Sequence, residues 1–329
     1  MQTLLIKNAR VIATMDESNS RLENADIFIR GPEIIDIGEN LVHEADTVID
    51  ASGKVVLPGL INTHHHLYQT LTRAVPAVQD AKLFDWLVYL YEIWRELSLE
   101  AVYWSAQCAI GELLLSGCTT TTDHLYLFPS SISGNLIDEE IRAAKEMGIR
   151  FHPTRGSMSL GESRGGLPPD DVVQTEEKIL EDSERLISAY HDPGQFSMTR
   201  IALAPCSPFS VTPELMKQTA ELAREKNVLL HTHLAETQDE EDFCIQMFGH
   251  RPVAYMQEVN WIGKDVWFAH SVHVNHDEIQ LYAETGCGVA HCPGSNMRLA
   301  SGIAPILEML SKGVDVGIGV DGSASNDSS

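Results

Sequence analysis

The chain has 329 residues, of which 43% are hydrophobic and 21% charged, as is usual for a globular protein with a sizeable core. Its formal net charge of −24 at pH 7 argues against nucleic acid as a partner, because binding to phosphates relies on Lys and Arg side chains. No apolar run is long enough to cross a bilayer, and the first residues resemble a strand more than a signal peptide, so we expect a cytoplasmic protein with no membrane partner.

Residues 1–57 contain short apolar runs that glycines and prolines interrupt, as in a small β module. From Pro58 onward, short apolar strands alternate with helical stretches, which is typical of parallel strands joined by crossover helices. We therefore expect two domains. Residues 1–57 are the N-terminal half of a small β-sandwich module, and residues 58–329 form a larger α/β domain.

Eight apolar segments of this larger domain have the length of buried strands, and helix-length intervals separate them. They cover residues 55–62, 119–124, 150–156, 199–205, 228–234, 266–270, 286–292 and 314–321. Eight such units close most naturally into a (β/α)8 TIM barrel. The structural alternative, a doubly wound open sheet, normally carries a glycine-rich phosphate loop after its first strand, and the sequence has none there.

Capping residues mark the starts of three helices between these strands. Ser98 precedes a helical stretch, and Thr212 stands directly before a proline that suits the first helical position. Asn275, with Glu278 three residues later, resembles a capping box. These signals support helices that alternate with the eight strands.

Polar side chains gather where the predicted strands end. They are His64, His66, His124, Arg155, Cys206, His233, His270, His291 and Asp321. The C-terminal ends of the strands carry the active site in (β/α)8 barrels. We therefore expect these residues to surround a common site.

Histidines in this set suit a divalent metal ion. His64 and His66 are two residues apart, so they face the same side of a strand while His65 faces away. His233 ends the fifth strand and offers a third nitrogen donor, whereas His231 lies one layer deeper as a hydrogen-bonded core histidine. A histidine-rich surface loop would account for the first pair, but not for the histidines that end other strands.

Three further polar residues add acid–base chemistry to this site. Asp321 emerges from the apolar eighth strand, and its burial is costly unless a cation pairs with it; a helix cap is the alternative. Glu236 follows His233 by three residues, where a carboxylate can shuttle protons. His270 ends the sixth strand and can orient an attacking water or hold the substrate.

The segments PGLINTHHH, HLAET, FAHSVH and GVDGSASN resemble the metal and catalytic motifs of the amidohydrolase superfamily, in its cytosine/guanine-deaminase-like branch. Longer stretches, among them TRGSMSLGE, GGLPP and LAPCSPFSVTPE, are similar to those of bacterial 8-oxoguanine deaminases and also resemble hydroxytriazine aminohydrolases. The resemblance implies one zinc ion bound by His64, His66, His233 and Asp321. It also implies that the catalytic residues are Glu236, His270 and Asp321.

The reaction implied by this resemblance is the hydrolytic deamination of an aminated purine-like heterocycle, 8-oxoguanine to urate and ammonia. A pterin (isoxanthopterin) or hydroxytriazine aminohydrolase is the alternative, because the same metal motifs serve all of these rings. The fourth strand has no lysine or glutamate near its end to bridge two metals, which favours a single ion. Three histidines and an aspartate also suit Fe²⁺ or Mn²⁺. The family suggests a homodimer. A metal-binding barrel without catalysis would not be expected to keep Glu236, His270 and Asp321 together.

Substrate specificity is expected to come from the loops around the metal. Gln69, Arg155 and Cys206 are candidates for contacts with the substrate, although Arg155 can instead pair with a carboxylate and Cys206 can simply pack. The aromatic-rich stretch 83–98 covers the pocket, forms a subunit interface or packs in the core. His124 and His291 are candidates for supporting the metal ligands from behind.

In the family, the barrel is followed by a further C-terminal segment that completes the last helix and the small β module. In this sequence, only eight residues follow Asp321. The sequence therefore indicates a barrel truncated after its eighth strand, with the C-terminal part of the β-sandwich absent.

Overall fold

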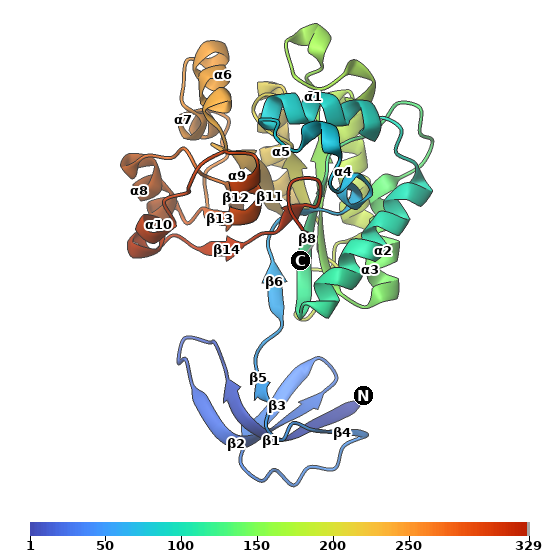
Figure 1. Cartoon of the computed structure of the whole chain (residues 1–329), viewed down its shortest axis with the longest axis vertical. Helices are drawn as coiled ribbons and strands as arrows, with labels where there is room; N and C mark the ends of the chain where they lie inside the picture. The colour runs from blue at the N-terminus through green and yellow to red at the C-terminus, as the bar shows by residue number, and fades with distance from the viewer. Residues whose placement is uncertain (328–329) are drawn as a thin grey trace. The chain divides into compact units, whose positions relative to one another are not determined.

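The structure is a computed structural model that describes residues 1–327 (Figure 1). Contacts between Cα atoms divide the chain into two compact units, with the division after Leu60. The sequence placed the division after residue 57. Each unit has its own hydrophobic core, so each is described separately.

The N-terminal unit is a five-stranded sheet with the strand order β3-β2-β1-β4, in which β5 also pairs with β1. Its strands are β1 (Thr3–Ala13), β2 (Arg21–Arg30), β3 (Glu33–Gly38), β4 (Thr47–Asp50) and β5 (Val55–Val56). The first strand pairs antiparallel with β2 and parallel with β4 and β5. The apolar runs of the sequence supply a buried hydrophobic cluster in this unit, as predicted. It includes Ala9, Ile12, Ala25 and Ile27.

The second unit is a nearly closed barrel of eight parallel strands, in the order β14-β13-β12-β11-β10-β9-β8-β6. The eight strands are β6 (Leu60–Asn62), β8 (Cys118–Leu125), β9 (Arg150–Ser157), β10 (Ala202–Pro205), β11 (Leu229–Leu234), β12 (Val266–His270), β13 (Gly288–His291) and β14 (Val316–Ile318). Two further short strands, β7 (His65–His66) and β15 (Asp321–Gly322), pair with each other. The seam between the first and last strands is closed by β7, which pairs with β15, and by the backbone hydrogen bond from Thr63 N to Ile318 O (3.0 Å). The predicted (β/α)8 barrel is confirmed.

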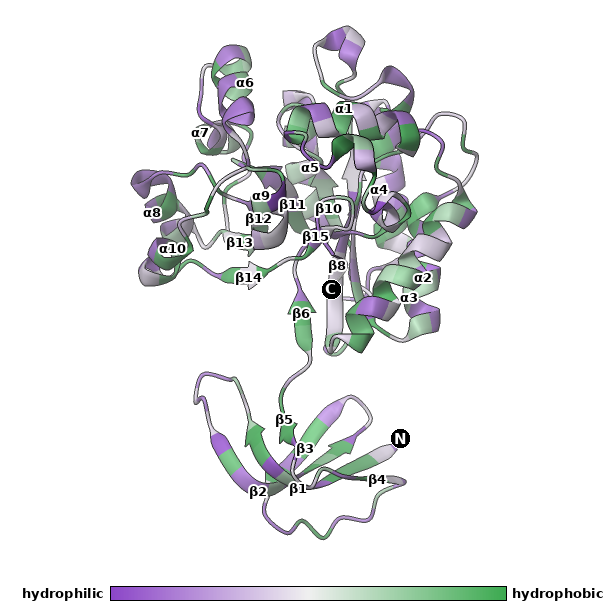
Figure 2. Ribbon diagram, viewed as in Figure 1, coloured by the Kyte–Doolittle hydropathy of each residue, from purple (hydrophilic) through white to green (hydrophobic). Residues whose placement is uncertain are grey.

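Helices alternate with these strands. They are α1 (Leu83–Trp94), α2 (Leu99–Leu115), α3 (Leu136–Met147), α4 (Glu176–Tyr190), α5 (Pro213–Lys226), α6 (Gln238–Phe248), α7 (Pro252–Glu258), α8 (His276–Thr285), α9 (Pro293–Arg298) and α10 (Ile306–Lys312). Among residues 1–327, short 3-10 helices lie in the connecting segments: η1 (Leu67–Thr72), η2 (Pro76–Val78), η3 (Glu162–Arg164) and η4 (Asp170–Val172). Several helices alternate green and purple along their length in Figure 2, as expected of helices with one apolar face. Within the described residues, no helix is both long and apolar enough to cross a membrane.

The three predicted helix starts are confirmed. The hydroxyls of Ser98 and Thr212 accept hydrogen bonds from backbone N–H groups in the first turns of α2 and α5. Asn275 accepts from the backbone of Glu278 (3.0 Å), and the Glu278 carboxylate accepts from the Asn275 N–H (2.8 Å), which completes the capping box of α8. Local sequence therefore determines where these helices begin.

A pair of buried carboxyl groups lies between β8 and α3. Asp123 and Glu140 are 1% and 0% exposed, and Asp123 accepts a hydrogen bond from the backbone N–H of Leu67 (2.7 Å). Burial raises the pKa of Asp123 to about 6 and the pKa of Glu140 well above its usual value. Because two adjacent carboxylates repel each other, the pair retains one proton, which Glu140 donates to Asp123.

This pair predicts that stability falls as pH rises. Both folded-state pKa values lie above the unfolded ones, so the stabilisation is complete below about pH 4 and is lost as pH rises through about 6 and beyond, at about 1.4 kcal/mol per pKa unit. Glu140→Gln keeps a donor towards Asp123 but needs no proton. The free energy of unfolding of this variant is measured with urea at pH 5 and at pH 8. It is expected to decrease less from pH 5 to pH 8 than the free energy of unfolding of the wild type. Glu221→Gln, at an exposed position of α5, is the control and should follow the wild type; parallel behaviour of Glu140→Gln would contradict this account.

Candidate active site

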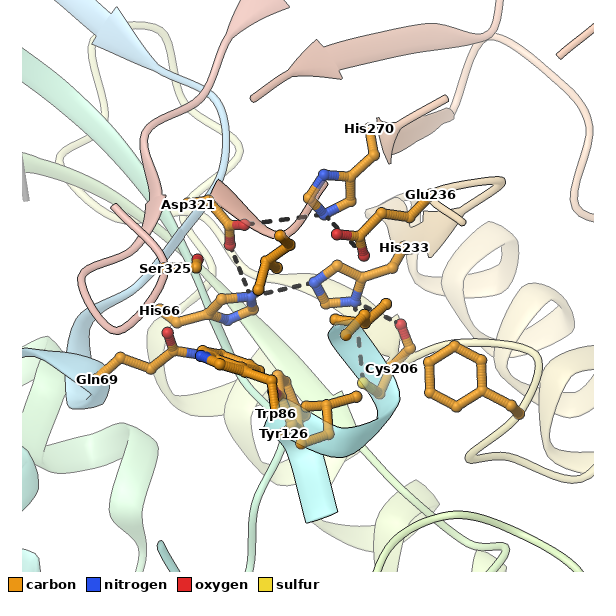
Figure 3. Close-up of a pocket in the computed structure, with 14 residues that line it drawn as sticks. His66, Gln69, Trp86, Tyr126, Cys206, His233, Glu236, His270, Asp321 and Ser325 are labelled. Atoms are coloured by element: carbon orange, nitrogen blue, oxygen red, sulfur yellow. Dashed lines mark hydrogen bonds and ion pairs between the residues drawn. The ribbon is translucent and has the colours of Figure 1, made fainter. Parts of the chain in front are cut away.

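A pocket opens where the barrel strands end, as the polar strand ends of the sequence predicted (Figure 3). Its empty space, including the part open to solvent, is about 390 Å³. Its lining consists of His66, Gln69, Leu83, Trp86, Leu87, Tyr126, Cys206, Phe209, His233, Glu236, His270, Leu299, Asp321 and Ser325. Polar groups from β7, β11, β12 and β15 thus face apolar side chains from α1 and the loops.

At the base of this pocket, imidazole nitrogens converge on one carboxylate. The Nε2 atoms of His64 and His66 lie 3.3 and 3.2 Å from Asp321 Oδ1. The Nε2 atoms of His66 and His233 are only 3.1 Å apart, and Figure 3 shows these two rings and Asp321 directed at one another. All four side chains are buried. The structure therefore brings together the four residues that the sequence proposed as metal ligands.

The hydrogen bonds behind the rings indicate that the inward nitrogens are lone-pair donors. His66 Nδ1 lies 2.6 Å from the carbonyl oxygen of His124, and His233 Nδ1 lies 2.7 Å from that of Cys206. A carbonyl only accepts hydrogen bonds, so each Nδ1 carries a proton, and each ring presents an Nε2 lone pair to the site when it is neutral. Burial lowers the pKa of His233 to about 3, which keeps this ring neutral.

Two lone pairs 3.1 Å apart repel each other unless a proton or a metal ion lies between them. Three neutral imidazoles and one carboxylate are also the donors that divalent metal ions take in proteins. The ligand atoms of His64, His233, His270 and Asp321 lie close enough together to hold one metal ion, and His66 borders this group through Asp321 and His233. These His and Asp side chains therefore form a metal-binding site.

An acid–base pair borders the cluster. His270 Nε2 lies 3.5 Å from Glu236 Oε2 and 4.0 Å from Asp321 Oδ2, and its Nδ1 lies 2.9 Å from the side-chain oxygen of Asn296. Burial raises the pKa of Glu236. The Glu240 carboxylate accepts hydrogen bonds from the backbone N–H groups of Ala235 (2.8 Å) and Glu236 (2.9 Å), which holds the loop that carries Glu236.

The backbone turns sharply at three of these positions. Ala235, His270 and Asp321 have φ angles of 52°, 72° and 63°, in the left-handed region that residues other than glycine seldom adopt. Each stands where a strand ends and its side chain or its neighbour's enters the pocket. Such strained conformations persist where the surrounding structure holds them, and they concentrate at functional sites.

Two of the three candidate substrate-binding residues line the pocket. Gln69 is 1% exposed, and its Oε1 atom has no hydrogen-bond partner among the described residues, so it is available to a ligand. Cys206 lines the opposite wall near His233, and burial raises the pKa of its thiol to about 12, which keeps it protonated. The structure therefore supports both positions as pocket residues.

The third candidate, Arg155, lies outside the pocket lining. Its guanidinium donates to Asp182 (2.6 Å) on α4 and to Gln174 (2.8 Å), and it stacks over the ring of Phe128 at 3.9 Å. The guanidinium is 0% exposed. Of the two roles that the sequence left open for Arg155, the structure shows the ion pair.

His124 and His231 contact histidines of the cluster. His124 donates from Nε2 to Ala204 O (2.9 Å), and its ring stacks on that of His233. His231 is fully buried and hydrogen-bonded, as predicted, and its partner is His64. His291 does not line the pocket, and the Nε2 of His273 donates to Ser301 O (2.8 Å).

The sequence did not single out several apolar and polar lining residues. Trp86 and its neighbours on α1 line the pocket and also pack in the core. Of the three roles considered for residues 83–98, the structure therefore shows covering of the pocket and packing in the core. Tyr126, Phe209, Leu299 and Ser325 lie in the segments that follow β8, β10, α9 and β15. The aromatic richness of residues 83–98 was the only signal, because loop residues carry no periodic pattern.

Comparisons with known proteins place this site in a family context. The chain is 54% identical to the 8-oxoguanine deaminase of Pseudomonas aeruginosa over 297 residues, which cover 90% of this chain and 66% of that protein. It is 40% identical to an isoxanthopterin deaminase from an unknown prokaryotic organism over 334 residues, 98% of this chain and 68% of that protein. The chain thus spans about two thirds of the length of these relatives.

Solved structures share the fold. A crystal structure of atrazine chlorohydrolase from Arthrobacter aurescens TC1 complexed with zinc superposes with a TM-score of 0.94 at 36% identity, covering 98% of this chain and 73% of that chain. The sequence profile described as "Amidohydrolase family" matches residues 55–329, which include the whole histidine–aspartate cluster. From the fold, the site and this match, the chain belongs to the amidohydrolase family.

Proposed function

We propose that this chain carries the catalytic barrel of a zinc-dependent aminohydrolase that converts 8-oxoguanine and water into urate and ammonia. The observation that carries the proposal is the convergence of three imidazole lone pairs and Asp321 beside the Glu236–His270 pair. The relative named 8-oxoguanine deaminase, at 54% identity, supports the choice of substrate.

In this proposal His64, His66, His233 and Asp321 hold one zinc ion. The relative solved with zinc supports the identity of the metal, although the same donors suit Fe²⁺ or Mn²⁺. Zinc, when bound, supplies a Lewis acid that lowers the pKa of water from about 15.7 to about 7. The residues around it provide the remaining chemistry.

Glu236 and His270 handle the protons of the reaction. The raised pKa of Glu236 favours its protonated form, which donates to a ring nitrogen of the substrate and makes the amino-bearing carbon electrophilic. His270 and Asp321 orient the attacking water and accept its proton. The 3.5 Å separation of His270 and Glu236 allows a proton to reach the departing amino group, which leaves as ammonia.

The walls of the pocket suit a flat heterocycle. Trp86, Phe209 and Leu87 offer apolar surface, while Gln69 and Cys206 offer polar atoms for ring substituents. Most small-molecule sites combine apolar walls with a few such polar groups. We propose that Gln69 accepts a hydrogen bond from a ring N–H of the substrate.

Gln69→Leu is therefore expected to raise KM about tenfold or more, because a substrate N–H that loses its buried partner costs about 1–3 kcal/mol. The zinc content should not change, since Gln69 contributes no ligand. Steady-state kinetics with metal analysis of the same preparation test this. Unchanged kinetics would remove Gln69 from the substrate site.

A second candidate function keeps the machinery and changes the ring. Relatives at 40% and 36% identity are named isoxanthopterin deaminase and hydroxydechloroatrazine ethylaminohydrolase, so a pterin or a hydroxytriazine is the alternative substrate. The intact Glu236–His270 pair argues against a barrel that binds metal without catalysis. A cytoplasmic location and a homo-oligomeric state remain predictions.

A panel assay decides between these functions. Ammonia release is measured from 8-oxoguanine, guanine, isoxanthopterin, cytosine and hydroxyatrazine with the zinc-loaded protein. We expect 8-oxoguanine to give the highest kcat/KM and to yield urate. A higher kcat/KM for isoxanthopterin or hydroxyatrazine would replace the substrate, and no turnover of any ring would overturn the proposed function.

A further inference from the structure

His231 forms a buried line of hydrogen bonds behind the metal-binding cluster. Its Nε2 atom lies 2.8 Å from Nδ1 of His64, and its own Nδ1 lies 2.9 Å from the backbone oxygen of Trp267. His231 and His64 are each 0% exposed. The line therefore runs from a backbone carbonyl through two imidazole rings to the Nε2 atom of His64, which lies 3.3 Å from Asp321 Oδ1.

The hydrogen bonds determine the tautomer of each ring in turn. The carbonyl of Trp267 can only accept, so Nδ1 of His231 carries the proton. A neutral imidazole has one N–H, which leaves a lone pair on Nε2 of His231 as an acceptor. Nδ1 of His64 must then donate to it, and the lone pair of His64 is left on Nε2, which faces the cluster.

From this geometry we propose that His231 is a positioning residue that sets His64 in its metal-binding tautomer. The inference rests on the proposed function only in that His64 is taken to hold the metal. Without His231, the opposite tautomer of His64 would place an N–H on Nε2 and donate it to Asp321 Oδ1, 3.3 Å away. That hydrogen bond would occupy both groups and oppose metal binding.

His64 differs in this respect from the other two histidines of the cluster. His66 and His233 donate from Nδ1 to the backbone carbonyls of His124 and Cys206. No side-chain substitution removes those acceptors. The acceptor behind His64 is a side chain, so its contribution can be isolated by mutation.

Packing fixes the ring of His231 as well. Its imidazole stacks on the indole of Trp267, with 4.3 Å between ring centroids and 17° between planes. The indole N–H of Trp267 donates to the carbonyl of Thr63 (3.2 Å), the residue before His64. Trp267 thus holds His231 through its carbonyl and its ring, and holds the strand of His64 through its N–H.

Three variants test the inference through zinc affinity, which needs no substrate. His231→Phe keeps the ring stacking but removes the acceptor, and His231→Gln keeps an acceptor at the end of its side chain. His152→Leu is the control, because the His152 ring also packs near Trp267 (5.7 Å between centroids) but lies outside the metal-binding cluster. The dissociation constant for zinc is measured by chelator competition on metal-free protein.

We expect His231→Phe to weaken zinc binding about 10- to 100-fold, the usual effect of losing such a supporting hydrogen bond. His231→Gln should stay within about threefold of the wild type, as should His152→Leu. ¹⁵N NMR of histidine-labelled, metal-free protein should show the His64 proton on Nδ1 in the wild type and on Nε2 in His231→Phe. If His231→Phe does not fold, as judged by circular dichroism, His231→Leu takes its place.

Wild-type zinc affinity and an unchanged His64 tautomer in His231→Phe would overturn the inference. Equal weakening in His231→Phe and His231→Gln would also overturn it, since only one of them lacks the acceptor. These results are independent of the panel assay. A protein that binds zinc but deaminates no ring would overturn the proposed function. The zinc affinities of the His231 variants would still decide the role of His231.

Discussion

Glu236→Gln is expected to lower kcat by about 10²–10⁴-fold, the usual contribution of a positioned acid or base, while zinc stays bound. The amide has nearly the shape of the carboxyl group but donates no proton to the ring nitrogen. Glu236 lies 3.5 Å from His270 and outside the four proposed ligands, so the metal-binding site should remain intact. Ammonia release and metal content are measured on the same preparation.

The matched control for this prediction is Asp239→Asn. Asp239 lies at the exposed start of α6, three residues after Glu236, and its substitution removes one carboxylate without entering the pocket. It should retain wild-type kcat. A Glu236→Gln protein within tenfold of the wild type would remove Glu236 from the mechanism, and loss of zinc from it would place Glu236 among the ligands instead.

Asp321→Asn is expected to abolish tight zinc binding and with it the activity. Removal of one member of a buried charge pair costs about 3–5 kcal/mol, which corresponds to about 10²–10⁴-fold in affinity. The carboxylate is the only anionic group among the four proposed ligands, and it faces both His64 and His66. Zinc affinity is measured by chelator competition, and turnover by ammonia release.

Chelation distinguishes loss of metal from loss of fold in this experiment. Wild-type protein stripped by a chelator should lose turnover and regain it when stoichiometric zinc is added. Asp321→Asn should not regain it at that concentration. Activity of Asp321→Asn equal to that of the wild type would show that the carboxylate is not a ligand.

The strands and caps could be predicted from the sequence because they depend on local patterns. β8 (Cys118–Leu125) extends one residue beyond each end of the predicted strand. The first and last strands are instead interrupted, the last one at Gly319, where a side chain would approach Cys292 Sγ and His64 Cβ at 2.9 Å. Such a close approach between distant segments has no local signature.

The same distinction applies to the site. Alternation along a strand correctly predicted that His64 and His66 face one side, because their spacing alone decides it. Alternation does not say which face of a strand is the inner one, and a shift of one residue reverses it. Arg155 lies in β9 two residues before the strand ends at Ser157, and its side chain is directed to Asp182 of α4.

The tautomers of the histidines were beyond prediction from sequence. They depend on which carbonyl lies behind each ring, as His124 O does for His66, and this follows from the closed barrel. Likewise, Trp86 reaches the pocket from a helix that precedes the second strand. Residue types near strand ends can therefore identify a metal site. The tautomers of its histidines and the residues that cover the pocket can be known only from the folded structure.

The convergence of His64, His66, His233 and Asp321 on one ion is tested most directly by a crystal grown with zinc and measured at the zinc absorption edge. We predict one anomalous peak in the pocket, about 2.0–2.2 Å from the three Nε2 atoms and from a carboxylate oxygen of Asp321. A peak bound by other residues, or no peak in a crystal of catalytically active protein, would contradict the account.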